Sequence, residues 1–187
     1  MKIGILALQG AFVEHKVILD KLNIENIYVK QKEDLDNIDG IILPGGESTA
    51  MGRLLRDFDL LDKLKSKIEN GLPVFGTCSG MILLAKHLSN DNTRHLGTMN
   101  ITVKRNAYGR QLGSFECKEK FKGIDNEVKM TFIRAPYVEK VDENVDILAK
   151  VDNHIVAVRE KNMLAISFHP ELTDDLSIHQ YFIKMIS

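Results

Sequence analysis

Residues 73–88 read PVFGTCSGMILLAKHL, and this stretch decides the fold. Residues 73–77 are short and apolar, as a buried strand would be, and residues 79–88 place apolar side chains at helical spacing. Between them, residues 76–80 have the form G-x-C-x-G, which is typical of a sharp strand-to-helix corner that presents a nucleophile. Glycines two positions before and after the nucleophile avoid side-chain clashes in such a turn. We therefore expect Cys78 at the carboxyl edge of a parallel sheet, where open α/β sheets bind ligands.

The predicted corner also favours chemistry at Cys78. A helix N-terminus stabilises the thiolate, which is the reactive form of cysteine. The backbone N–H of Ser79 would point toward an oxyanion formed there. An isolated cysteine is most often a buried packing residue, but the flanking glycines and the strand-to-helix switch favour a nucleophile. Cys117 lies within a strand pattern and is assigned to packing.

Strand and helix signals alternate through the first half of the chain. The predicted strands are residues 2–8, 26–30, 40–43 and 73–77, and the predicted helices are residues 12–22, 49–56, 60–70 and 79–88. Such alternation implies right-handed crossovers and a parallel sheet covered on both faces.

The second half changes character, because short strand patterns follow one another with short connections. These strands are predicted over residues 101–105, 112–117, 131–133, 145–151, 155–159 and 163–168, and a helix over residues 176–186 closes the chain. Asp152-Asn153 predicts a hairpin turn. The expected fold class is α/β, with three layers, a mostly parallel central sheet flanked by helices and a small antiparallel section. We expect residues 1–187 to form a single domain.

Composition excludes several classes of protein. The 187 residues are 44% apolar and 27% charged, which is ordinary for a globular protein and unlike disordered, collagenous or coiled-coil chains. A net charge of −1 gives no general attraction to nucleic acid or to a membrane surface. The apolar run at residues 3–8 is too short for a spanning helix, which needs about 20 residues, or for a signal peptide. Two cysteines are too few for a disulfide framework or a zinc ribbon, so we expect a cytoplasmic protein.

A base for the thiol is predicted at His169-Pro170-Glu171, which directly follows the apolar strand at residues 163–168. The residue before proline is extended, and in an extended segment residues two apart share a face. His169 and Glu171 can therefore project together, with Glu171 holding one imidazole nitrogen and the other left free for Cys78. H-x-E alone is a weak signal, and a surface pair is the alternative. Its position at the carboxyl end of a strand favours the catalytic interpretation.

Residues 44–48, PGGES, lie between a predicted strand and a predicted helix. Two glycines allow the backbone to approach a ligand closely, and Gly46 could supply a second N–H to the oxyanion. The helix start at Glu47 and Ser48 could hold the polar end of a substrate. A simple strand–helix turn is the alternative. It is not a phosphate-binding Walker loop, because no Gly-Lys-Ser/Thr follows.

The remaining candidates are histidines and arginines. His15 and His179 lie on predicted helices and are interpreted as surface or packing residues, and His87 is placed near the end of the corner helix. Arg105 and Arg134 end or follow strands, and an arginine fork suits a carboxylate, although most surface arginines are only solvated. No HExxH or paired CxxC is present, so no metal site and no cofactor are expected.

Taken together, these motifs resemble class I (triad) glutamine amidotransferases, and more closely the glutaminase subunits of pyridoxal 5′-phosphate synthase. The resemblance spans nearly the whole chain. It is carried by GILALQG at residues 4–10, LPGGEST at 43–49, FGTCSG at 75–80, Arg105-Asn106 with Gly109-Arg110-Gln111, FIRAP at 132–136 and SFHPELT at 167–173. Ser79 is a small departure, because alanine is frequent there in the family.

The resemblance implies a flavodoxin-like fold and hydrolysis of L-glutamine to L-glutamate and ammonia. Cys78 would form a glutamyl thioester, His169 would carry protons and Glu171 would orient the imidazole, with Gly46 and Ser79 at the oxyanion. The implied glutamine-binding residues are Gly46, Glu47, Ser48, Arg105, Ile133 and Arg134.

The resemblance also implies a partner. Ammonia would pass to a synthase subunit that makes pyridoxal 5′-phosphate from ribose 5-phosphate and glyceraldehyde 3-phosphate, in an assembly of twelve copies of each subunit. Glutaminases of this type are nearly inactive alone, and completion of the turn at Gly45-Gly46 in the complex is one explanation.

Two rival interpretations remain open at this point. One is a stand-alone thiol hydrolase or deglycase on the same corner architecture, which would act without a partner. The other is a regulatory or scaffold subunit that kept the fold and lost turnover. The presence of Cys78, His169 and Glu171 argues against this second alternative.

Overall fold

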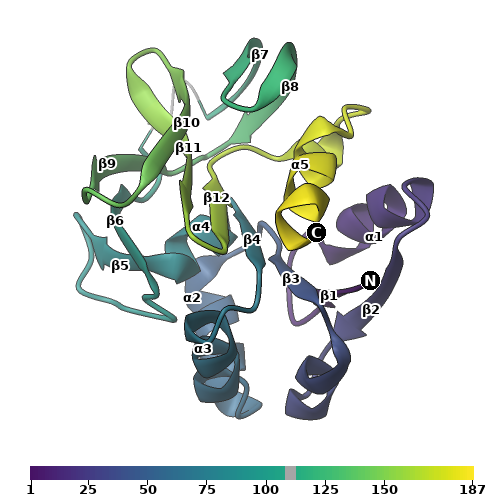
Figure 1. The fold of residues 1–187 in the computed structure, drawn as a ribbon. Helices are drawn as coiled ribbons and strands as arrows, with labels where there is room; N and C mark the ends of the chain where they lie inside the picture. Colours follow the sequence, from purple (N-terminus) through teal and green to yellow (C-terminus); the bar gives the residue numbers. More distant parts are fainter. Residues whose placement is uncertain (108–112) are drawn as a thin grey trace.

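The computed structural model of the chain describes residues 1–107 and 113–187 (Figure 1). Two features of the sequence analysis fall outside the described residues: the segment Gly109-Arg110-Gln111, and Leu112, the first residue of the strand predicted over 112–117. Within the described ranges, no helix is both long enough and apolar enough to cross a membrane.

Helices and strands alternate in the first half of the chain, as predicted, and strands dominate the second. The first half contains β1 (Lys2–Leu6), α1 (Phe12–Lys21), β2 (Glu25–Val29), the 3-10 helix η1 (Lys32–Asn37), β3 (Gly40–Leu43), α2 (Ser48–Asp57), α3 (Leu61–Glu69), β4 (Val74–Thr77), α4 (Ser79–Leu84) and β5 (Ala85–Leu88). The second half contains β6 (Met99–Lys104), β7 (Ser114–Phe121), β8 (Ile124–Ile133), β9 (Tyr137–Val141), β10 (Asp146–Val151), β11 (His154–Glu160), β12 (Met163–Ile166), the 3-10 helix η2 (Pro170–Leu172) and α5 (Ser177–Ile186).

A central mixed sheet organises the molecule. Its strand order is β2-β1-β3-β4-β12-β11-β9-β6-β5, with β10 paired to β11. The strands from β2 to β12 run parallel, β11 and β9 are antiparallel to their neighbours, and β5 is parallel to β6. β7 and β8 form a separate antiparallel hairpin. The predicted α/β class, with a mostly parallel part and an added antiparallel section, is confirmed.

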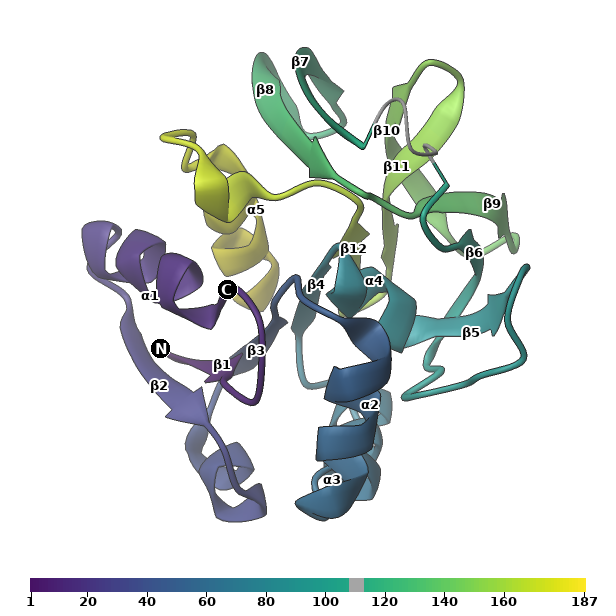
Figure 2. The same ribbon diagram turned by 180° about the vertical axis from the view of Figure 1, so that it is seen from behind.

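Helices cover both faces of the parallel part of the sheet, with α1 and α5 on one face and α2, α3 and α4 on the other (Figures 1 and 2). Strand β4 shows the reason, because successive side chains of a strand point to opposite faces. Val74 belongs to the cluster that contains Leu55 of α2, whereas Phe75 belongs to the cluster that contains Leu19 of α1 and Phe182 of α5. Full burial of such a side chain contributes about 1.5–3 kcal/mol, so both layers stabilise the sheet.

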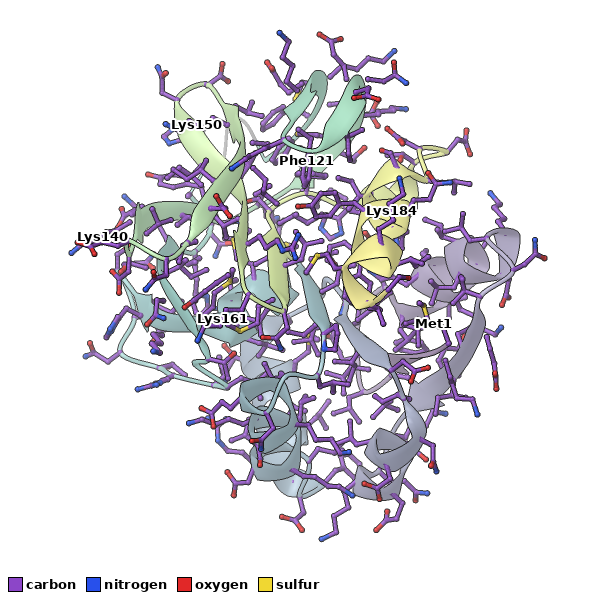
Figure 3. All side chains as sticks on the ribbon, in the orientation of Figure 1. Met1, Phe121, Lys140, Lys150, Lys161 and Lys184 are labelled. Carbon is purple, nitrogen blue, oxygen red and sulfur yellow. The ribbon has the colours of Figure 1, made fainter. Side chains whose placement is uncertain are left out.

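The β7–β8 hairpin lies over the end of α5. Phe121 points into the space between them (Figure 3), and its ring centroid is 5.3 Å from that of Tyr181 on α5. Labelled lysines such as Lys140 and Lys150 lie at the periphery of the molecule in the same view. The hairpin is a separate two-stranded sheet, joined to the domain by this aromatic contact and by backbone hydrogen bonds such as that from His169 N–H to the Thr131 carbonyl at 2.8 Å.

The corner helix is shorter than predicted. α4 ends at Leu84, and residues 85–88, predicted as its last turn, form strand β5 beside β6. Leu84, Ala85 and Leu88 fit a helical spacing, but pairing with Met99 and the following residues of β6 buries both ends of β5 as a strand. His87 therefore lies on a strand and not near the end of a helix.

Other elements differ in extent. β8 was predicted only over residues 131–133 but begins at Ile124, and β9 and η1 were not predicted. The outward-facing positions of β7 and β8 are polar, which weakens their apolar signal. The hairpin turn at Asp152-Asn153 is confirmed: it joins β10 to β11, and both residues have positive φ, 48° and 65°.

Candidate active site

Four parallel strands end at one edge of the sheet and bring distant segments together. β1, β3, β4 and β12 are neighbours in that order, and they are followed by Gln9-Gly10, Gly45-Gly46, Cys78 and His169. The register pairs Thr77 of β4 with Ile166 of β12, and Cys78 N–H donates to the Ile166 carbonyl at 2.8 Å. The thiol and the imidazole thus leave adjacent strands within a few residues of the same register position.

The corner at Cys78 has the geometry that its glycines suggest. Cys78 has φ 48° and ψ −99°, an unusual backbone conformation for a residue with a side chain, and it caps the N-terminus of α4. A Cβ at Gly76 would lie 2.6 Å from the Gly80 carbonyl carbon, and a Cβ at Gly80 would lie 2.2 Å from the Leu43 carbonyl oxygen. The sharp turn therefore requires glycine at both positions, and it holds the sulfur at the sheet edge.

Cys78, His169 and Glu171 lie together at the sheet edge. His169 Nδ1 lies 2.6 Å from Glu171 Oε1, and the side chains of His169 and Cys78 line the same cavity. The three residues are only 6–7% exposed. Burial opposes the charged imidazole, but the interactions with Cys78 and Glu171 outweigh it and raise the pKa of His169 to about 10. The site therefore favours an imidazolium beside the sulfur, which is the state that stabilises a thiolate.

The turn after β3 lies against this series. A Cβ at Gly45 would be 2.3 Å from Cε1 of His169, so the imidazole occupies the space of the absent side chain. The Gly46 N–H donates to the Ser79 hydroxyl oxygen at 3.3 Å, and the same hydroxyl donates to the Gly46 carbonyl. The amide expected to serve an oxyanion is thus engaged by a side chain.

A cavity of about 490 Å³ opens at this edge of the sheet, and its volume is in the range of small-molecule sites. Its walls contain ten residues that the sequence analysis marked, namely Gly45, Gly46, Glu47, Ser48, Cys78, Ser79, Arg105, Ile133, Arg134 and His169. Glu171 is behind the wall, as a residue that acts through the imidazole would be. The structure therefore gathers the predicted triad and the predicted binding residues at one place.

Two charged residues of the cavity wall, Glu47 and Arg105, already have hydrogen-bond or ion-pair partners within the chain. Glu47 caps α2, and its carboxylate accepts from Thr49 N–H at 3.0 Å and Ala50 N–H at 2.7 Å. Arg105 pairs with Asp91 at 2.7 Å and lies 3.6 Å from Glu47. These contacts fix the Arg105 guanidinium at the cavity wall, where it can receive a carboxylate.

Ile133 and Arg134 lie at the mouth of the cavity. Both are exposed, Ile133 to 40%, although Ile133 is the last residue of strand β8. Arg134 has φ 44°, a left-handed backbone that turns the chain away from the strand direction. This corner brings the end of β8, far from the other site residues in sequence, to the cavity.

Two features beside the cavity were missed by sequence reasoning. Gln9 Oε1 accepts from the Glu47 N–H at 2.8 Å and supports the glycine turn, and a Cβ at Gly10 would lie 1.9 Å from the Gly45 carbonyl oxygen. Both residues belong to the GILALQG motif at residues 4–10, which extends beyond the end of β1, but the sequence analysis gave them no role. His15, interpreted as a surface or packing residue, is fully buried and lies 3.6 Å from Glu171 Oε2.

Comparison with known proteins places the chain in a family. The model of the SNO glutamine amidotransferase family matches residues 5–187. A curated relative from Streptococcus pneumoniae (strain CGSP14), named "Pyridoxal 5'-phosphate synthase subunit PdxT", is 57% identical over 99% of this chain and 97% of its own length. A homologue from S. pneumoniae (strain 70585) with the same name is 56% identical over the same shares.

Solved structures agree with this assignment. One described as "Crystal structure of glutamine amidotransferase" has a TM-score of 0.94 and 42% identity, and covers 98% of each chain. PurLQS from Thermotoga maritima has a TM-score of 0.75 at 16% identity, covering 100% of this chain and 99% of the other, and shares the fold alone. The sequence match over nearly the whole length, together with the cysteine corner and its histidine, shows that this chain belongs to the SNO glutamine amidotransferase family.

Proposed function

We propose that this chain hydrolyses L-glutamine to L-glutamate and ammonia, as the glutaminase subunit of a pyridoxal 5′-phosphate synthase. The observation that carries the proposal is the cavity in which Cys78 meets His169, whose Nδ1 lies 2.6 Å from Glu171. Relatives 56–57% identical over nearly the whole chain are named as subunits of that synthase.

The first chemical step is acyl transfer to sulfur. The Cys78 thiolate attacks the side-chain carboxamide carbon of glutamine, and the tetrahedral intermediate places negative charge on the former carbonyl oxygen. His169, held as the imidazolium, gives its proton to the nitrogen that leaves as ammonia. A glutamyl thioester on Cys78 remains, and the imidazole is neutral.

The second step is hydrolysis of the thioester. Neutral His169 takes a proton from water, whose oxygen attacks the thioester carbon and displaces the sulfur. The product leaves as the γ-carboxylic acid with the oxygen from water and loses its proton to solvent to give glutamate, and the thiolate–imidazolium pair is restored. Glu171 keeps the His169 tautomer and stabilises its positive charge in both steps.

Substrate binding is proposed for the residues that line the cavity. Arg105 would receive the α-carboxylate of glutamine, and the turn at Gly46, Glu47 and Ser48 would bind the remaining polar groups together with Ile133 and Arg134 at the mouth. The fixed position of Arg105 between Asp91 and Glu47 supports this role.

The oxyanion donors are proposed to be the backbone N–H groups of Ser79 and Gly46. Because the Ser79 hydroxyl engages Gly46 in the free chain, full donation requires a change at the Gly45-Gly46 turn. We propose that docking of the synthase subunit drives that change.

The assembly and location are further parts of the proposal. We expect residues 1–187 to act as one glutaminase domain in a complex of twelve copies of each subunit, which the mass of the purified complex would test. Cys78 and Cys117 are both free thiols, and a nucleophilic thiol needs a reducing compartment, so the cytoplasm is the proposed location.

The decisive assay measures glutamate formed from glutamine by the chain with and without its synthase partner. Wild-type chain should turn over in the complex, and Cys78→Ala should abolish turnover while still binding the partner. Full turnover by Cys78→Ala would refute the proposal. Activity of the isolated chain on small carbonyl compounds would instead favour the stand-alone hydrolase. Failure of a glutamine-mimicking electrophile to label Cys78 in the complex would favour a scaffold subunit.

A further inference from the structure

Glu171 uses only one of its two carboxylate oxygens on the imidazole. Oε1 lies 2.6 Å from His169 Nδ1, whereas Oε2 is buried and has no hydrogen-bond partner among the described residues. An ionised oxygen in such a setting is costly unless a dipole or charge stabilises it. The structure places one ring nitrogen near it: Nε2 of His15 on α1, at 3.6 Å.

His15 belongs to a buried polar series between α1 and α5. Its Nδ1 lies 2.9 Å from Nε2 of His179, and its Nε2 lies 3.3 Å from the Thr77 hydroxyl. Both histidines are fully buried. Each neutral imidazole has one donor and one acceptor nitrogen, so the contacts determine which nitrogen carries the proton.

One arrangement of protons satisfies these contacts better than the other. If His179 Nε2 donates to His15 Nδ1, then His15 carries its proton on Nε2, which faces the Glu171 carboxylate and Thr77. The reverse arrangement would turn a lone pair of His15 toward the carboxylate and leave a buried N–H on His179 Nδ1, which has no partner among the described residues. The reverse arrangement is therefore the more costly one, because it leaves a buried N–H of His179 unpaired and places a lone pair of His15 next to the Glu171 carboxylate.

We propose that His15 is a positioning residue for the glutaminase reaction, whose Nε2–H faces Glu171 Oε2 and keeps the carboxylate turned toward His169, with His179 fixing the tautomer. At 3.6 Å the contact is too long for a hydrogen bond. It acts instead as a dipole next to a charge, an interaction that is strong where water is absent. The inference rests on the proposed function, because it extends the proposed triad by one residue.

The charge state of His15 fits this role. Burial lowers the pKa of His15 well below its usual value, and the neighbouring His179 and His169 lower it further. Burial likewise lowers the pKa of His179 to about 3. The titratable groups facing His15 are thus His179, His169 and Glu171, and His15 stays neutral between them. A neutral N–H orients Glu171 without competing as a cation for the carboxylate that His169 needs.

The test compares two polar replacements at position 15 by the pH dependence of Cys78 alkylation. His15→Gln can place its amide N–H near the position of Nε2, whereas the shorter side chain of His15→Asn cannot. Iodoacetamide is added to the isolated chain over a series of pH values, and modification of the Cys78 peptide is measured by mass spectrometry. Leu19→Val, at a buried position on the same helix, is the control for lost packing.

We expect His15→Asn to shift the rise of Cys78 alkylation to higher pH, because a less restrained Glu171 stabilises the His169 imidazolium less. In the synthase complex, kcat should fall about 10-fold with KM for glutamine little changed, because a dipole that acts on the buried carboxylate is lost. His15→Gln should lie close to wild type in both measurements. Leu19→Val should lower the melting temperature and leave the pH profile unchanged.

A wild-type pH profile in His15→Asn, or equal profiles for His15→Asn and His15→Gln, would overturn the proposal. If His15→Asn does not fold, His179→Phe removes the group that fixes the tautomer while His15 stays in place. His179→Phe should also shift the rise of Cys78 alkylation to higher pH, by a smaller amount than His15→Asn. An unshifted pH profile in His179→Phe would overturn the proposal as well. Because alkylation needs neither glutamine nor a partner, its result stands apart from a failure of the proposed glutaminase activity.

Discussion

Replacing Ser79 by alanine should raise the glutaminase activity of the chain without its synthase partner. The Ser79 hydroxyl accepts from Gly46 N–H at 3.3 Å and donates to the Gly46 carbonyl. A neutral hydrogen bond contributes about 0.5–1.5 kcal/mol, so the pair holds the turn by about 1–3 kcal/mol. At about 1.4 kcal/mol per factor of ten, loss of both should increase the fraction of chains with a free Gly46 N–H about 5- to 150-fold. The backbone N–H of residue 79 is unaffected.

The assay measures glutamate formation by the isolated chain and by its synthase complex. Basal activity of Ser79→Ala should rise within that range, while activity in the complex, where docking has already freed the turn, should change much less. Ser167→Ala is the matched control, because Ser167 is buried nearby and its hydroxyl contacts the Met81 sulfur rather than Gly46. Unchanged basal activity in Ser79→Ala, with normal activity in the complex, would show that the hydroxyl does not restrain the turn.

Three further predictions concern the same site. Glu171→Gln removes a group that helps raise the pKa of His169 to about 10, so that pKa should fall. The imidazolium should then form only at lower pH, and turnover should drop about 10- to 100-fold. An NMR titration of His169 identical to that of the wild type would contradict this prediction. Gly80→Ala puts a methyl group 2.2 Å from the Leu43 carbonyl oxygen and should displace the turn at Cys78, with turnover about 100-fold lower. Normal kinetics would show that this turn does not require glycine at position 80. Burial raises the pKa of the Cys117 thiol, so Cys117→Ala should retain wild-type glutamate production, and its loss would give that residue a role in the reaction.

Local patterns predicted the parallel half of the fold well. The strand predicted over residues 40–43 has the same bounds as β3, and the corner at Cys78 occurs where the glycines indicated. Both depend on short-range signals, namely a continuous apolar run and a turn that excludes side chains. Strand β5 was mistaken for helix because its buried residues Ala85 and Leu88 are three apart, as in a helix. An irregularity in the pairing with β6, between Ala85 and His87, allows that spacing in a strand. Such pairing is long-range information that residue spacing does not contain.

The same distinction separates the site residues that were predicted from those that were missed. Cys78 and His169 could be identified because each follows a buried strand in a recognisable motif. His15 could not, because its helical position shows only that one face of α1 is buried. Its proximity to Glu171 arises from the packing of α1 against η2, 156 residues further along the chain. Ser79 was expected to contribute its backbone, whereas its hydroxyl also holds the glycine turn.

The central claim is that the Cys78 sulfur carries the glutamyl group between the two steps. Acid-quenching the synthase complex during turnover of glutamine, followed by mass spectrometry of its peptides, tests this directly. The account predicts a hydroxylamine-sensitive glutamyl adduct on the Cys78 peptide that is absent from Cys78→Ala. Glutamate production with no adduct at Cys78, or with the adduct at Cys117, would contradict it.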